Sequence, residues 1–93
     1  MEKTQFVRTE LLLGNKALEK LSKSTVAIFG VGGVGSFTAE ALARTGIGKI
    51  ILIDYDIIDI SNINRQVHAT FDTIGKPKVE VMKERLLQIN PNT

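Results

Sequence analysis

Cysteine is missing from the 93 residues of this chain. The sequence can therefore form no disulfide, supply no thiolate ligand to zinc and use no cysteine as a nucleophile. Long apolar runs are missing too, since none approaches the roughly 18 residues of a membrane span, and the first ten residues, MEKTQFVRTE, lack the apolar centre of a signal peptide. These absences fit a reducing compartment, and we expect a cytoplasmic protein with no membrane partner.

A strong excess of charge of one sign is also missing. The 12 Lys and Arg residues face 10 Asp and Glu residues, so the charge balance requires neither a nucleic acid nor a membrane as partner. With 43% hydrophobic and 24% charged residues, the composition is that of a globular protein and argues against a disordered or fibrous chain. The length suits one small domain but is short for a complete doubly wound nucleotide-binding fold.

Two apolar stretches, TVAIFG (25–30) and KIILID (49–54), predict buried parallel strands that are covered on both faces. Between them, apolar residues recur every three or four positions, which predicts a helix that starts at Gly33 and is stopped by Gly46 and Gly48. A strand, glycine turn, helix and strand in this order form a right-handed βαβ unit. We therefore predict an α/β fold, the N-terminal part of a Rossmann-like doubly wound parallel sheet.

Two further helices are expected on either side of this unit. Asn15 is placed to cap a short helical segment near the N-terminus. Pro77 suits the first turn of a later helix, in which an apolar stripe at helical spacing runs up to the Asn90-Pro91 pair. Because two strands do not make a stable parallel sheet, we expect residues 1–93 to be the incomplete nucleotide-binding part of a larger domain.

The glycine turn fits the G-x-G-x-x-G pattern through Gly30, Gly32 and Gly35, with Gly33 in a variable place. Such glycines give a tight turn, close approach of the backbone to a phosphate and close packing of helix on strand, and the following helix start binds anions. A tight turn that binds nothing is the alternative. Asp54 ends the second strand and is suited to accept hydrogen bonds from ribose hydroxyls.

Other acidic residues near that strand end, Asp56 and Asp59, are expected only to cap a loop. Up to this point the pattern fits NAD and ATP equally well. The next segments, SNINRQVH and GKPK, bring an amide, a guanidinium and an ammonium group toward the turn, from Asn62, Arg65 and Lys78. A dinucleotide pyrophosphate needs little beyond backbone N–H groups, whereas a triphosphate attacked at its α-phosphorus develops charge that cations stabilise.

With these segments in view, the sequence GVGGVGSFTAEALARTGIGKIILIDYDIIDISNINRQ, followed by GKPK, resembles the nucleotide-binding half of the ubiquitin-activating-enzyme-like adenylating family. This HesA/MoeB/ThiF family includes the molybdopterin-synthase and thiamine sulfur-carrier adenylyltransferases, and the resemblance covers about residues 8–91. The stretches EALARTGIG and NRQVHA look most like the branch that dehydrates threonylcarbamoyladenosine in tRNA.

The resemblance implies an enzyme in which a carboxylate attacks the α-phosphorus of Mg-ATP, pyrophosphate leaves and an acyl-adenylate forms. The carboxylate would belong to threonylcarbamoyladenosine of tRNA, whose activation leads to loss of water and ring closure. The alternative substrate is the C-terminal glycine of a ubiquitin-like sulfur carrier. Two other functions remain open on the residues alone: an NAD-binding module of an oxidoreductase, and a dimerising scaffold with a vestigial loop.

The resemblance also assigns roles to single residues. Arg8 would reach across a homodimer to the triphosphate of the partner, and Lys78 would neutralise the α-phosphate. The Mg²⁺ ligand is expected beyond residue 93, so no metal ligand is assigned here and the 93 residues alone are expected to be inactive. His68 matches the dehydratase branch but is expected to be a packed polar residue. The remaining roles are phosphate binding by Gly30, Gly32, Gly33, Gly35, Asn62 and Arg65, and ribose binding by Asp54.

Overall fold

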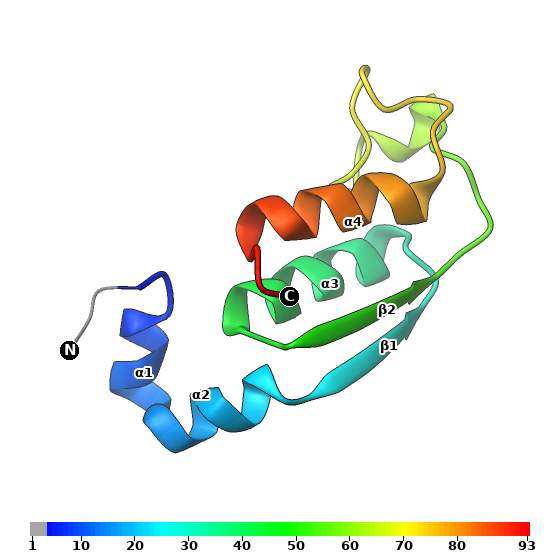
Figure 1. Cartoon of the computed structure of the whole chain (residues 1–93). Coiled ribbons are helices and arrows are strands. Elements are labelled where there is room, and N and C mark those ends of the chain that lie inside the picture. Colours follow the sequence, from blue (N-terminus) through cyan, green and yellow to red (C-terminus); the bar gives the residue numbers. More distant parts are fainter. Residues whose placement is uncertain (1–3) are drawn as a thin grey trace.

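The computed structural model describes residues 4–93. Their elements follow in the order α1 (Val7–Leu13), α2 (Asn15–Ser22), β1 (Thr25–Phe29), α3 (Gly33–Thr45), β2 (Lys49–Ile53), the 3-10 turn η1 (Ile60–Asn62) and α4 (Lys78–Ile89) (Figure 1). The predicted strand, glycine turn, helix and strand are thus present, and the α/β prediction is confirmed. None of the helices within residues 4–93 is long and apolar enough to cross a membrane.

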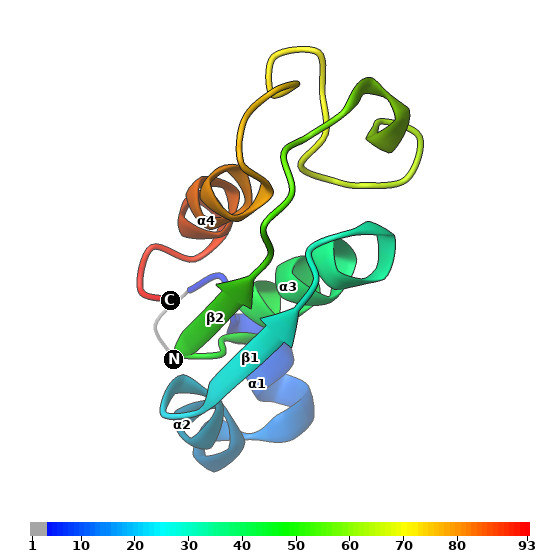
Figure 2. The same cartoon turned by 90° about the vertical axis from the view of Figure 1, so that its right-hand side faces the viewer.

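The sheet consists of β1 and β2, which run parallel and pair in register from Thr25 opposite Lys49 to Phe29 opposite Ile53. Helix α3 makes the crossover between them and contacts β1, while α4 contacts β2. Figures 1 and 2 show α3 and α4 side by side on the same face of the two strands. Both strands end at the glycine turn, so their carboxyl ends define one end of the molecule.

The core lies between this helix pair and the sheet. Ala39 and Ala43 of α3 are fully buried, and their small side chains let α4 approach closely. Helix α4 contributes the predicted apolar stripe, of which Met82 and Leu86 are buried. The other buried members of the cluster come from β1 and the glycine turn, namely Ile28 and Val31.

The expectation that both strands are covered on both faces is wrong for the described residues. Along β1 only Ile28 is buried, whereas Phe29 keeps 79% of its surface exposed. On β2, Ile51 keeps 41% exposed. The reason is geometric: α3 and α4 both pack on one face, and successive strand residues point to opposite faces, so every second apolar residue faces away from the helices.

The N-terminal helices differ from expectation in two details. Gly14, with a φ of 88°, occupies the N-cap position of α2, so Asn15 is the first helical residue and does not cap it. Helix α1 was not predicted, because its leucine run has no periodic pattern and Leu11, Leu12 and Leu13 stay exposed. Helix α2 itself lies where the sequence placed it.

Candidate functional site

The glycine loop, residues 30–35, joins β1 to α3 and contains two glycines that the fold itself requires. Gly30 has a φ of 93° and donates its N–H to the Ile53 carbonyl at 2.8 Å. Positive φ is costly for any residue with a Cβ atom. A Cβ atom at Gly35 would collide with the Gly30 carbonyl oxygen. Gly30 and Gly35 therefore shape the loop.

Gly32 and Gly33 are different, because a side chain would meet little within the described residues. A Cβ atom at Gly32 would lie 3.9 Å from the Gln66 amide nitrogen, and one at Gly33 would lie 3.6 Å from the Arg65 stem. Gly32 is also the N-cap of α3, whose first-turn N–H groups have no intrahelical acceptor. The open space in front of Gly32 therefore suits an anion, which the helix start would attract.

Asp54, the residue after β2, is tied directly to this loop. Its Oδ2 accepts the Val31 N–H at 2.7 Å and its Oδ1 accepts the Asp56 N–H at 2.8 Å. Burial raises the pKa of the Asp54 carboxyl, but these two donors and the Lys78 charge outweigh it and hold that pKa below the usual 3.8. The ionised carboxylate has further lone pairs to offer, as a ribose hydroxyl would need.

Asn62 lies in η1 and is engaged in a reciprocal cap with Asp59. The Asn62 Oδ1 accepts the Asp59 N–H at 2.8 Å, while the Asp59 carboxylate accepts the Ser61 N–H at 2.9 Å. The capping role predicted for Asp59 is confirmed. Since the amide oxygen of the buried Asn62 is occupied, its Nδ2 group is the part that can serve a phosphate oxygen.

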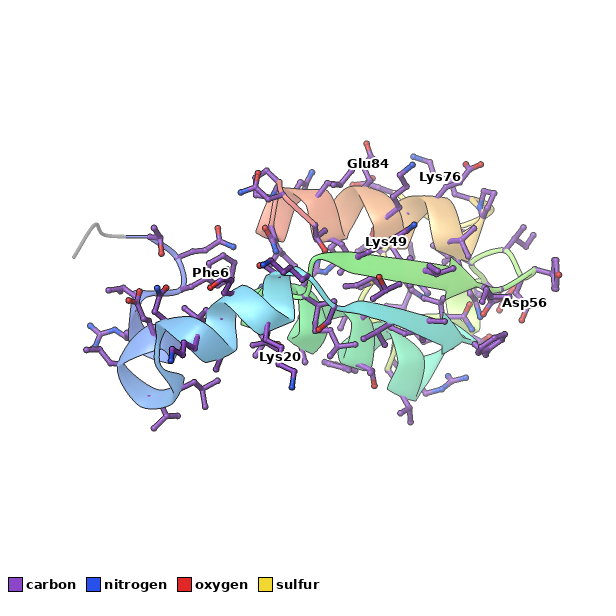
Figure 3. The ribbon with its side chains drawn as sticks, turned by 60° about the horizontal axis from the view of Figure 1, so that its bottom comes forward. Phe6, Lys20, Lys49, Asp56, Lys76 and Glu84 are labelled. Carbon is purple, nitrogen blue, oxygen red and sulfur yellow. The ribbon has the colours of Figure 1, made fainter. Side chains whose placement is uncertain are left out.

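Arg65 and Lys78 supply the positive charge. Arg65 is exposed, its stem lies beside Gly33, and its Nη1 donates to the Ser61 carbonyl at 3.0 Å. Lys78, the first residue of α4, is only 6% exposed, and its Nζ lies 3.9 Å from the Asp56 carboxylate. Asp56 thus acts as a counterion for Lys78, which the sequence did not indicate. Figure 3 shows Asp56 just beyond the ends of the strands.

Arg8 does not join this group. It is exposed on α1, and Figures 1 and 2 place α1 beyond the amino ends of the strands, at the end of the molecule opposite the glycine loop. The side chain of nearby Phe6 lies at that same end in Figure 3. A contact between Arg8 and a glycine loop would therefore need the loop of another chain.

Two buried residues of the NRQVH segment reach the loop as well. His68 is 2% exposed and its Nε2 lies 2.7 Å from the Val31 carbonyl oxygen, which confirms it as a packed polar residue. Gln66 is 6% exposed, and its Oε1 has no hydrogen-bond partner among the described residues. Sequence reasoning did not single out Gln66, and the only signal was its place beside Arg65 in a segment already suspected of reaching the turn.

Other parts of the described structure offer less chemistry. A hollow of about 420 Å³ lies between β2 and α4, away from the glycine loop, and is lined mainly by apolar side chains such as Ile50, Leu52 and Leu86. Within residues 4–93 no three His, Asp or Glu side chains gather closely enough to hold a metal ion.

Comparison with known proteins agrees with this geometry. The chain is 60% identical over 87 residues to the tRNA threonylcarbamoyladenosine dehydratase of Bacillus subtilis, and 47% identical over 74 residues to the ubiquitin-like modifier-activating enzyme 5 of Caenorhabditis elegans. These matches cover 94% and 80% of this chain, and 34% and 17% of the relatives. The chain thus spans about a third or less of the length of the curated relatives it matches.

Among solved structures, the Escherichia coli tRNA N6-threonylcarbamoyladenosine dehydratase in complex with ATP superposes with a TM-score of 0.93 at 52% identity. That match covers 95% of this chain and 36% of the other. The ThiF family profile matches residues 6–93, nearly the whole sequence. By its sequence, its fold and the arrangement of its glycine loop, the chain belongs to the ThiF family.

Proposed function

We propose that this chain is the nucleotide-binding part of an ATP-dependent adenylating enzyme. In the reaction, a substrate carboxylate attacks the α-phosphorus of ATP, pyrophosphate leaves and an acyl-adenylate forms. The observation that carries the proposal is the open space at Gly32, which lies at a helix start, next to Gly33 and the Arg65 stem. The ATP complex of a relative at 52% identity supports the same assignment.

The proposed roles follow from the chemistry of each group. Backbone N–H groups from Gly32 onward hold phosphate oxygens, aided by the Asn62 amide nitrogen and the Arg65 guanidinium. Lys78 stabilises the charge that develops at the α-phosphate, and Asp54 accepts hydrogen bonds from the ribose. The chemistry needs no nucleophilic side chain, because orientation and charge stabilisation can lower the barrier.

Threonylcarbamoyladenosine of tRNA is the proposed source of the carboxylate, with loss of water and ring closure following adenylation. The 60% identity to a dehydratase of that substrate supports this choice over the C-terminal glycine of a ubiquitin-like carrier. The ubiquitin-like modifier-activating enzyme 5 of Drosophila persimilis, in comparison, is 51% identical over a shorter stretch. An NAD-binding module would leave Asn62, Arg65 and Lys78 without a purpose.

The proposal extends to the assembly. A homodimer would bring Arg8 of one subunit to the triphosphate held by the other, which fits the position of α1 far from its own glycine loop. Magnesium would reach the site with ATP, and no residue of 4–93 is assigned to it. A cytoplasmic location, where tRNA is modified, completes the proposal.

The test is ATP–pyrophosphate exchange by the full-length protein with three carboxylate substrates in separate reactions. These are tRNA that carries threonylcarbamoyladenosine, the same tRNA without that modification, and a ubiquitin-like carrier with a C-terminal Gly-Gly. Exchange only with the modified tRNA is expected. Exchange only with the carrier would identify the carrier, and not the tRNA, as the substrate. Binding of NAD with no exchange at all would overturn the proposed activity.

A further inference from the structure

The peptide groups on both sides of Val31 are held by side chains from distant parts of the chain. Val31 is fully buried within the glycine loop. Its N–H donates to Asp54 Oδ2 at 2.7 Å, and its carbonyl oxygen lies 2.7 Å from His68 Nε2. These partners are 23 and 37 residues away in the sequence, so the loop's geometry depends on the segment after β2.

The protonation of His68 follows from this contact. A carbonyl oxygen only accepts hydrogen bonds, so Nε2 must carry the proton and donate it. Burial lowers the pKa of His68, which leaves the ring neutral near pH 7 with Nδ1 unprotonated. Nδ1 is buried and has no partner within the described residues. The histidine itself is anchored, because the Thr73 hydroxyl donates to its carbonyl oxygen at 2.7 Å.

The contact also fixes the direction of the next N–H group. The Val31 carbonyl and the Gly32 N–H belong to one planar trans peptide, in which C=O and N–H point in opposite directions. When His68 holds the carbonyl inside the protein, the Gly32 N–H must point away from His68. Within residues 4–93 this N–H has no acceptor, and Gly32 is the residue with open space before it.

We infer that His68 is a positioning residue, which aims the Gly32 N–H at a nucleotide phosphate by holding the Val31 carbonyl. The inference rests on the proposed function, because it takes the anion at Gly32 to be a phosphate of ATP. A glycine has no Cβ atom to keep its peptide in one orientation, so a donor on the preceding carbonyl is an effective restraint. Without that donor, the peptide between Val31 and Gly32 is free to rotate, and the Gly32 N–H no longer points in one direction.

The experiment compares equilibrium ATP binding and thermal stability in full-length variants. His68→Leu removes the donor, whereas His68→Gln keeps an N–H group near the place of Nε2. Asn90→Leu is the matched control, because the equally buried Asn90 also donates from its side chain to a backbone carbonyl, that of Ala43 at 3.3 Å, at the other end of the helix pair.

We expect His68→Leu to weaken ATP binding about tenfold, the effect of losing roughly one hydrogen bond. His68→Gln should stay within about threefold of the unmodified protein, and Asn90→Leu should keep its ATP affinity although its melting temperature falls. If His68→Leu does not fold, His68→Asn replaces it, since the shorter amide does not reach the Val31 carbonyl.

Three results would overturn the inference. The first is full ATP affinity in the variant that lacks the donor, and the second is equal loss in His68→Gln. The third is an equal loss in Asn90→Leu at matched stability, which would make the effect one of general packing. None of these three results contradicts the proposed function. That function would be contradicted by a different result, namely that the unmodified protein does not bind ATP.

Discussion

At the scale of single residues, the glycines of the glycine loop have different roles. Gly30 and Gly35 are needed by the backbone, one for its positive φ and the other for close approach to a carbonyl oxygen. A Cβ atom at Gly32 would have room, because its nearest neighbour would be the Gln66 amide nitrogen at 3.9 Å. The open space in front of Gly32 is best explained by a ligand.

Substitutions at two of these glycines should consequently have opposite effects. Gly32→Val should fold with a circular dichroism spectrum like that of the unmodified protein, but its ATP binding should be lost because the side chain occupies the phosphate position. Gly35→Ala should lower the melting temperature strongly, because its Cβ atom has no space. Calorimetric ATP titration and thermal melts of both variants provide the comparison. Unchanged ATP affinity in folded Gly32→Val would refute the phosphate site.

Lys78 is predicted to act mainly during adenylate formation. Its stem is buried and its ammonium lies 3.9 Å from exposed Asp56, so the charge is already held near the loop before reaction. Lys78→Ala should reduce ATP–pyrophosphate exchange by roughly 10²- to 10³-fold with little change in ATP affinity. The matched control is Lys76→Ala, two residues earlier and exposed. A parallel fall of rate and affinity would make Lys78 a binding residue instead.

At the scale of elements, the sequence predicts the helices and strands that depend on the local pattern of apolar residues, glycine and proline. Strands β1 and β2 and helices α3 and α4 follow from apolar periodicity and from glycine and proline positions. The segment between β2 and α4 does not, because contacts distant in sequence shape it: the Ile58 N–H donates to the Lys76 carbonyl, and Ile57 pairs with Pro77. The sequence named most candidate site residues but could not show that Gln66 and His68 fold back under the glycine loop.

The two helices that cover the sheet are also joined by charge. Arg85 of α4 donates from Nε to Glu40 of α3 at 2.7 Å, and the Glu40 side chain is only 16% exposed. Arg44 approaches the same carboxylate at 3.8 Å from an exposed position. Arg85→Ala should cost about 1 kcal/mol of unfolding free energy, and Arg44→Ala close to none.

Urea unfolding of these two variants and of Glu40→Gln tests the assignment. A double-mutant cycle between Glu40 and Arg85 isolates the energy of the pair. A coupling energy near zero between Glu40 and Arg85 would show that this ion pair does not help to hold α3 and α4 together.

At the scale of the whole molecule, the described chain is elongated, with extents of 43 by 22 by 19 Å. Helix α1 lies at one end and the glycine loop at the other (Figure 1). If Arg8 serves a neighbouring loop, an Arg8→Ala subunit and a Lys78→Ala subunit should complement each other. Equal mixtures of freely exchanging subunits should recover about a quarter of the unmodified activity, because half the dimers then hold one intact site.

Each variant alone should remain nearly inactive, and light scattering with tagged subunits should confirm that exchange took place. If the subunits exchange and no activity is recovered, Arg8 either acts at the site of its own subunit or has no role in the reaction.

The two hydrogen bonds that hold Val31 should affect both the rate at which the glycine loop binds an anion and the conformational entropy that this binding costs. Glycine-rich segments usually lose much conformational entropy when a ligand orders them. Here Asp54 and His68 impose that order through bonds internal to the chain, so the entropy is lost on folding and not on association. If the loop binds an anion as proposed, we expect its donors to be oriented before the anion arrives, so that diffusion and electrostatic attraction set the association rate.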